Sequence, residues 1–331
     1  MAQTESQLRR ATARARRPLT WAVTIVVIVV TLWTRSGSLH WSGEAAADYR
    51  WHLGWACIAL GGVASVLQNW VPSLLLLALG FFHLGPELAL SVPRGTVAAA
   101  GQPLTVAMVT LEAGAEDQRP FLDWIEAEDM AAEQRPDLLF LTQVDQLALG
   151  QLGELEAHGF IDRHVWPAEA DWTADTRGNV FLSRLPTSGY SAGELGRLFE
   201  LEVDLAGTPV TVLAARMPRP LSEQGVDQRA ELVELLGTRA ARSPNTVVLA
   251  KLNATLYAPA YQRLLSLGEL TDSRMGFGRK TSWSDDRFLP GLELAVDHVL
   301  VGDGLLVLDR RVEHLTLGQG REPVICRVSL R

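Results

Sequence analysis

The hydrophobic pattern divides the chain at about residue 100. Three long apolar stretches lie before that point, at residues 19–34, 51–70 and 71–92. Polar residues are scarce on every side of these stretches, which is typical of helices surrounded by lipid or by protein. Stretches of roughly 17–25 such residues can cross a bilayer. The pattern therefore predicts about three transmembrane helices, of which the second and third form a hairpin.

After residue 100 the pattern changes to short β runs that alternate with amphipathic helical segments. Strands are predicted at residues 104–111, 137–144, 179–184, 198–205, 209–216, 246–252, 294–302, 305–315 and 323–330. Helices are predicted at residues 119–134, 145–159, 225–241 and 258–268. Many strands with few helices favour a layered α/β sandwich over a doubly wound parallel sheet.

These patterns predict four parts of the chain. The parts are a basic arm (1–18), a membrane region (19–92), a linker (93–103) and an α/β domain (104–331). The arm contains five arginines, Arg9, Arg10, Arg14, Arg16 and Arg17. Because basic residues gather on the cytoplasmic side of a membrane, we expect the N-terminus to be cytoplasmic. Three spans, or one, then place the domain on the opposite side, and only a two-span arrangement reverses this.

Composition narrows the classes of function. The formal net charge is −8, and the acidic residues are concentrated after residue 112, so we expect no nucleic-acid partner. Only two cysteines occur, Cys57 and Cys326, and they predict no disulfide framework. The seven histidines show no spacing typical of metal ligands. No metal or other cofactor is expected from these residues.

Eight ordered sequence blocks resemble the endonuclease/exonuclease/phosphatase superfamily. They are LTVAMVTL, LLFLTQV, GNVFLSRLP, TVLAARMPRP, VVLAKLNAT, LTDSRMGFGRKTSW, AVDHVLVG and GQGREPVICRVSL, within Leu104 to Leu330. The chain is especially similar to bacterial members with hydrophobic helices before the domain. The resemblance implies a four-layered α/β sandwich, a divalent metal that activates water against a phosphoester, and a periplasmic domain anchored in a bacterial inner membrane.

The resemblance also relates the polar site positions of the family to residues of this chain. The matching residues are Thr110, Gln143, Arg216, Lys251, Asn253, Asp297, Gly320 and Arg321. Asn253 and Asp297 keep the residue type of the family. The other six replace, in chain order, an asparagine, a metal-binding glutamate, a catalytic histidine, an aspartate, and a closing aspartate and histidine.

These replacements predict a chemically altered site without catalytic residues or a metal. A charged lysine at position 251 can neither coordinate a cation nor accept a proton. Together Arg216, Lys251, Asp297 and Arg321 form either a structural ion-pair cluster or an anion-binding site. An unpaired buried carboxylate is costly, so we expect Asp297 to pair with Lys251 or with Arg321.

Three hypotheses for function follow. In the first, the chain is a membrane-anchored, catalytically inactive domain that serves as an accessory subunit of a larger membrane complex, with other membrane subunits and the bilayer as its partners. In the second, it is a divergent metal-dependent phosphoesterase that uses Asp297, His298 and Asn253, with Asp145 or Asp272 near a shifted metal. In the third, the cationic cluster senses a phosphate compound or a lipid head group.

Overall fold

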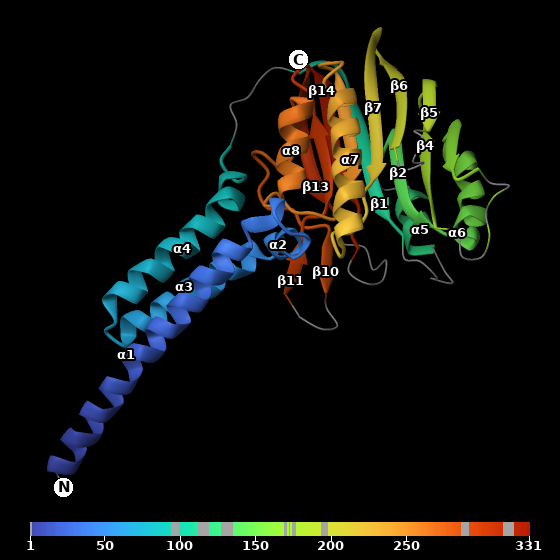
Figure 1. The fold of residues 1–331 in the computed structure, drawn as a ribbon. Coiled ribbons are helices and arrows are strands. Elements are labelled where there is room, and N and C mark those ends of the chain that lie inside the picture. The colour runs from blue at the N-terminus through green and yellow to red at the C-terminus, as the bar shows by residue number, and fades with distance from the viewer. Residues whose placement is uncertain are drawn as a thin grey trace.

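The computed structural model describes residues 2–93, 99–111, 119–126, 135–168, 171, 173, 177–192, 198–285, 291–313 and 321–331. The chain begins with a helical module that extends as a rod from a β-rich domain (Figure 1). The elements of this module are α1 (Ala2–Trp33), the short 3₁₀ helix η1 (Ser36–Ser38), α2 (Trp41–Ala47), α3 (Arg50–Val66) and α4 (Trp70–Ala89).

Two six-stranded sheets make up the centre of the domain. The first sheet has the order β13 (Leu305–Val312), β14 (Val324–Leu330), β1 (Ala100–Thr110), β2 (Leu138–Val144), β4 (Gly178–Ser183) and β3 (Asp162–Trp166). The second has the order β5 (Thr187–Ala192), β6 (Leu198–Leu205), β7 (Thr208–Arg216), β8 (Thr246–Lys251), β12 (Asp297–Val301) and β9 (Thr271–Asp272). A separate hairpin pairs β10 (Trp283–Asp285) with β11 (Leu292–Leu294).

The buried side chains arrange these sheets and the helices in four layers. One apolar cluster lies between the sheets and includes Phe140 of β2 and Phe199 of β6, whose rings are 5.8 Å apart. A second cluster joins the outer face of the first sheet to α5 (Arg119–Glu126), α6 (Gln146–Gln151) and the 3₁₀ helix η3 (Leu152–His158). A third joins the other sheet to α7 (Glu223–Ala240) and α8 (Pro259–Gly268). The predicted four-layered α/β sandwich is therefore confirmed.

The structure also contains strands that the pattern did not predict. These are β3, β5 and β9 at the sheet edges, and the hairpin of β10 and β11. Five of the six residues of β5 are exposed, so this strand lacks the alternation of apolar and polar positions that identifies a half-buried strand. The linker expected at 93–103 ends earlier than predicted, because β1 already pairs with β14 at Ala100. Residues 94–98 of that linker and residues 127–134 of the helix predicted at 119–134 lie outside the described chain.

The helical module contains the three predicted apolar segments, with corrected limits. The segments expected at 51–70 and 71–92 are α3 and α4, because a turn at Leu67–Asn69 ends the first and Leu90 caps the second. Within the described chain, α4 (Trp70–Ala89) is the one helix that is long and apolar enough to cross a bilayer by length and composition. The apolar part of α1, Arg17–Trp33, is shorter. Three membrane spans therefore stay a prediction.

Glycines allow α3 and α4 to pack closely. An added Cβ at Gly80 of α4 would lie 2.6 Å from Ile58 Cδ1, and one at Gly54 of α3 would lie 2.8 Å from Leu84 Cδ2. The Cβ at Gly80 would also lie 3.1 Å from the backbone oxygen of Gly54, so the two helices approach closely where both lack a side chain. The hydroxyl oxygen of Thr31 in α1 is 3.0 Å from Nε2 of His83 in α4. This hydrogen bond connects α1 to the pair of α3 and α4.

Helix α2, which was not predicted, connects the module to the domain through two carboxylates. Arg229 of α7 pairs with Glu44 at 2.5 Å, and both side chains are buried. Asp48, just after α2, accepts a hydrogen bond of 2.6 Å from the backbone N–H of Thr255. The hydroxyl of Tyr257 also donates to the carbonyl of His83 in α4. The helical rod is therefore fixed to the sandwich at several buried polar contacts.

We expect substitution of Arg229 by alanine to weaken this connection strongly. The change leaves the Glu44 carboxylate buried without a cation, which typically costs about 3–5 kcal/mol. The double variant Glu44→Leu, Arg229→Met should recover most of this stability, since no charge stays buried. Thermal unfolding of the full chain in detergent measures both effects.

The matched control is Arg263→Ala, which removes the exposed partner of Glu234 in the same helical layer. Exposed ion pairs contribute little, so this variant should unfold close to the temperature of the natural chain. Equal destabilisation by Arg229→Ala and Arg263→Ala would show that the buried pair does not hold the module to the domain.

Candidate functional site

Strand register brings most of the predicted site residues to one end of the sandwich. Thr110 pairs with Thr142 where β1 and β2 run parallel, and Arg216 pairs with Lys251 where β7 and β8 run parallel. These residues all lie at the carboxyl ends of their strands. Asp297 begins the antiparallel strand β12 and lies opposite Lys251. The two sheets therefore present these side chains to a common cleft.

Lys251 lies at the centre of this arrangement. Its Nζ donates to Thr110 Oγ1 at 2.9 Å and to Asp297 Oδ1 at 3.2 Å. The lysine is only 5% exposed and the aspartate 4%. Of the two ion pairs expected for Asp297, the structure contains the one with Lys251, so this prediction is confirmed. Because Thr110 belongs to the other sheet, the ammonium also joins the two halves of the sandwich.

The electrostatic surroundings of Lys251 are cationic. Burial lowers the pKa of its ammonium, the carboxylate of Asp297 raises it again, and the positive charges of Arg321 and Arg216 lower it further. The net shift is downward. Three of the four residues of the predicted cluster are thus positive charges close enough to influence one another, and Asp297 is the carboxylate that opposes them.

Gln143 and Arg321 form a second contact in the cleft. Gln143 has φ of 62°, in the left-handed region, and its Oε1 accepts a hydrogen bond from Arg321. The same nitrogen of Arg321 donates to the carbonyl of Leu111 at 2.6 Å. The neutral amide of Gln143 therefore binds the guanidinium of Arg321 through a hydrogen bond. Gly320, the other closing position, lies outside the described residues.

Asn253 and His298 have partners in the backbone. Asn253 also has a left-handed φ, of 50°, and its Nδ2 donates to the carbonyl of Met217 at 2.7 Å. His298 is fully buried, with Nε2 2.7 Å from the carbonyl of Ala254. Burial, and secondly the charge of Arg274, lowers the pKa of His298 to about 4. The imidazole is therefore neutral near pH 7 and supports the loop between β8 and α8.

The two carboxylates considered for a shifted metal lie in other contacts. Asp145 Oδ1 caps α6 by accepting from the N–H of Ala148 at 2.9 Å. Asp272 pairs with the guanidinium of Arg274 at 2.7 Å. Burial alone would raise the pKa of Asp272, but Arg274 more than offsets this and holds the pKa well below its usual range. Both acids therefore stabilise structure where they lie.

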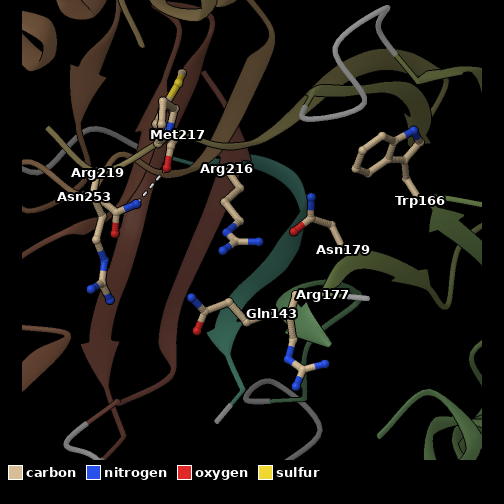
Figure 2. A pocket seen from close by; sticks show the side chains of 9 residues that line it. Gln143, Trp166, Arg177, Asn179, Arg216, Met217, Arg219 and Asn253 are labelled. Carbon is tan, nitrogen blue, oxygen red and sulfur yellow. Dashed lines mark hydrogen bonds between the residues drawn. The ribbon is translucent and has the colours of Figure 1, made fainter. Parts of the chain in front are cut away.

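A cavity of about 480 Å³ forms part of this cleft. Figure 2 shows Arg216 in the middle of its lining, between the amides of Asn179 and Asn253, with Gln143 and Arg177 nearby. Arg219 and Trp166 also line it. Sequence reasoning missed Arg177, Asn179, Arg219 and Trp166. Arg177 directly precedes the block GNVFLSRLP, Asn179 is its second residue, and Arg219 lies within TVLAARMPRP. The position of these residues in or beside the family blocks was the available signal.

The helical module forms part of a neighbouring cavity of about 200 Å³. Its lining includes Lys251, Asn253, Arg219 and Arg321 of the domain, and Asp48 and Tyr49 of the helical module. Since Arg219 and Asn253 line both cavities, the two are lobes of one cleft. Burial raises the pKa of Asp48 to about 6, although its hydrogen bond from Thr255 acts in the opposite direction. The turn between α2 and α3 thus contributes to the lining of the cleft.

The residues present do not fit the divalent metal that the family resemblance implies. Such ions prefer several carboxylate oxygens. Within the described part of the chain, no three His, Cys, Asp or Glu side chains come together as possible ligands. In the cleft, Asp297 faces the ammonium of Lys251. The position at which the resemblance implies a metal-binding glutamate is occupied by the neutral Gln143, which binds Arg321.

Comparison with solved structures shows the same fold at low sequence identity. An endonuclease/exonuclease/phosphatase from Beutenbergia cavernae superposes with a TM-score of 0.53 and 19% identity, over 69% of this chain and 72% of that one. A protein of the same family from Bacteroides thetaiotaomicron has a TM-score of 0.51 and 15% identity, over 70% and 99%. The human Nocturnin catalytic domain gives 0.51 and 15%, over 71% and 97%.

These identities show similarity of fold alone, and no curated protein sequence matches the chain. The sequence profile described as "Endonuclease/Exonuclease/phosphatase family" matches residues 111–318, which is more than half of the chain. The matched region contains the whole second sheet and four strands of the first (β13, β2, β4 and β3), together with most of the cleft. The chain therefore belongs to the endonuclease/exonuclease/phosphatase family.

Proposed function

We propose that the chain is a membrane-anchored, catalytically inactive member of its family that serves as a structural subunit of a larger membrane complex. The observation that carries the loss of activity is the buried ammonium of Lys251, bonded to Thr110 and Asp297. A positive charge there repels a divalent cation, and a protonated lysine cannot act as a base. Removal of a single such group commonly costs orders of magnitude in rate.

The rest of the cleft supports the same proposal. Gln143 lacks the charge of a metal-binding carboxylate, and Arg216 and Arg321 add two positive charges to that of Lys251. Asn253 and His298, which a divergent phosphoesterase would need, are bonded to the carbonyls of Met217 and Ala254. No contact of the described residues favours the hydrolase alternative, so we propose only the inactive form.

Exposed apolar side chains support the membrane anchor. They cover α1, α3 and α4 and include Ile25, Val26, Val29, Trp55, Val63, Leu74 and Phe81. Large apolar surface of this extent is typical of contact with lipid or with other membrane helices. With the arginine-rich arm in the cytoplasm and three spans, the domain would lie in the periplasm of a bacterial inner membrane.

The accessory role combines two features of the molecule. The helices offer apolar surface to lipid and to other membrane subunits, and buried contacts hold the domain rigidly to them. A domain without catalytic activity can still present a rigid binding surface to a partner. The acidic net charge makes nucleic acid an improbable ligand for it.

We expect Lys251→Met to destabilise the chain by about 3–5 kcal/mol, because it leaves Asp297 buried without a cation. The double variant Lys251→Met, Asp297→Leu should recover most of this loss. Thermal unfolding in detergent, with the exposed Arg242→Gln as a control, measures the effect. A single variant as stable as the natural chain would show that the cleft does not depend on the ion pair.

Mg²⁺ and Mn²⁺ should leave the unfolding temperature of the natural chain unchanged. If the chain had a metal site, a free metal concentration of a hundred times the Kd would raise the free energy of unfolding by about 2.7 kcal/mol. The matched control is Gln143→Glu, Lys251→Asp, which returns two carboxylates to the cleft and should respond more strongly to either ion. Stabilisation of the natural chain by metal, together with hydrolysis of a phosphoester, would overturn the proposed inactivity.

The accessory role predicts stoichiometric partners in the native membrane. Purification of the chain in mild detergent, followed by mass spectrometry, should recover a constant set of membrane subunits. Arg263→Ala, which changes an exposed ion pair, should recover the same set. A chain that migrates alone in several mild detergents would contradict the role of subunit.

A further inference from the structure

The cavity beside Arg216 is lined by cationic side chains, which the proposed structural role does not explain. Arg177, Arg216 and Arg219 line it, and Lys251 and Arg321 lie in the adjoining lobe. Guanidinium groups bind phosphate oxygens through paired N–H donors. A volume of about 480 Å³ is within the range of small-molecule sites. The lining therefore suits a small anion.

A second observation, independent of the arginines, also indicates a ligand. Asn179 is only 2% exposed and lines the same cavity, and its Oδ1 is buried without a hydrogen-bond partner among the described residues. A buried acceptor without a hydrogen-bond partner is destabilising, because it has lost its water and gained no donor. A phosphate has no proton to offer this oxygen at neutral pH when fully ionised. A neighbouring hydroxyl group of the ligand would satisfy it.

The position of the cleft beside the helical module bears on which ligands can reach it. Asp48 and Tyr49 of the module are among the residues that line the adjoining lobe. The same two residues directly precede α3, which begins at Arg50. If α3 enters the bilayer there, the cavity lies near the membrane surface. Both a soluble compound and a lipid head group can then reach it.

We propose that this cleft binds a polyol phosphate without a metal ion. The arginines hold the phosphate, with Arg216 as the central contact, and a hydroxyl of the polyol donates to Asn179 Oδ1. The inference rests on the proposed loss of metal-dependent catalysis, since a living hydrolase would cleave such an ester. Glycerol 3-phosphate is the soluble form of this chemistry, and the head group of phosphatidylglycerol is its lipid form.

Calorimetric titration of the full chain in neutral detergent, in the presence of EDTA, tests the inference. Glycerol 3-phosphate should bind and should bind more tightly than inorganic phosphate. Arg216→Gln should weaken binding by about tenfold or more, as expected for the loss of a charge-assisted hydrogen bond. The exposed Arg263→Gln should bind as the natural chain does.

Asn179→Ala separates a ligand contact from a purely structural role. If the amide receives the hydroxyl of the ligand, this variant should lose the preference for glycerol 3-phosphate over inorganic phosphate while it still binds inorganic phosphate. A variant that keeps the preference would overturn the assignment of Asn179. If the natural chain binds neither glycerol 3-phosphate nor inorganic phosphate, the whole inference is overturned.

Nanodiscs distinguish the two sources of the ligand. The chain is placed in discs of phosphatidylcholine alone or of phosphatidylcholine with phosphatidylglycerol, and glycerol 3-phosphate is titrated into each. Weaker apparent binding in the second disc identifies the lipid head group as a competitor for the cleft, and equal binding identifies a soluble ligand. Release of inorganic phosphate in the presence of Mg²⁺ would instead overturn the proposed inactivity, so the two failures can be told apart.

Discussion

The fold depends on how the chain accommodates positive charge at the meeting point of its two sheets. Lys251 ends β8 inside the sandwich, where an isolated ammonium would be very costly. Thr110 from one sheet and Asp297 from the other supply its two hydrogen bonds. The same contact closes the carboxyl ends of the central strands. The carboxylate of Asp297 and the hydroxyl of Thr110 thus compensate the buried charge of the lysine at this end of the sandwich.

Buried charge also determines how the domain is attached to the helices. Glu44 lies on the short helix α2 and Asp48 lies just after it, and each meets a partner from the domain. Apolar packing adds to this, because Ala47 and Leu90 belong to the same cluster as α7 and α8. Directional polar contacts fix one orientation, whereas apolar packing alone tolerates rotation.

Much of this architecture could be predicted from the sequence, for physical reasons that differ between elements. Central strands such as β2 and β8 are continuous apolar runs because both faces are buried, and they stand out clearly. The edge strand β5 has mostly exposed residues and gives no such signal. The predicted ion pair of Asp297 followed from the cost of burying a lone carboxylate. Arg177 and Asn179 could not be joined to Arg216 by pattern alone, because their proximity depends on how two sheets pack.

The turn between α2 and α3 has a mechanical consequence. Asp48 lies two residues before α3 and holds the backbone of Thr255, which is two residues after Asn253 in the cleft. A tilt of α3 therefore pulls directly on the loop that shapes the cleft, with no slack segment between them. Because α3 runs from this turn along the rod and away from the domain (Figure 1), a change at its first turn reaches the cleft through a single hydrogen bond.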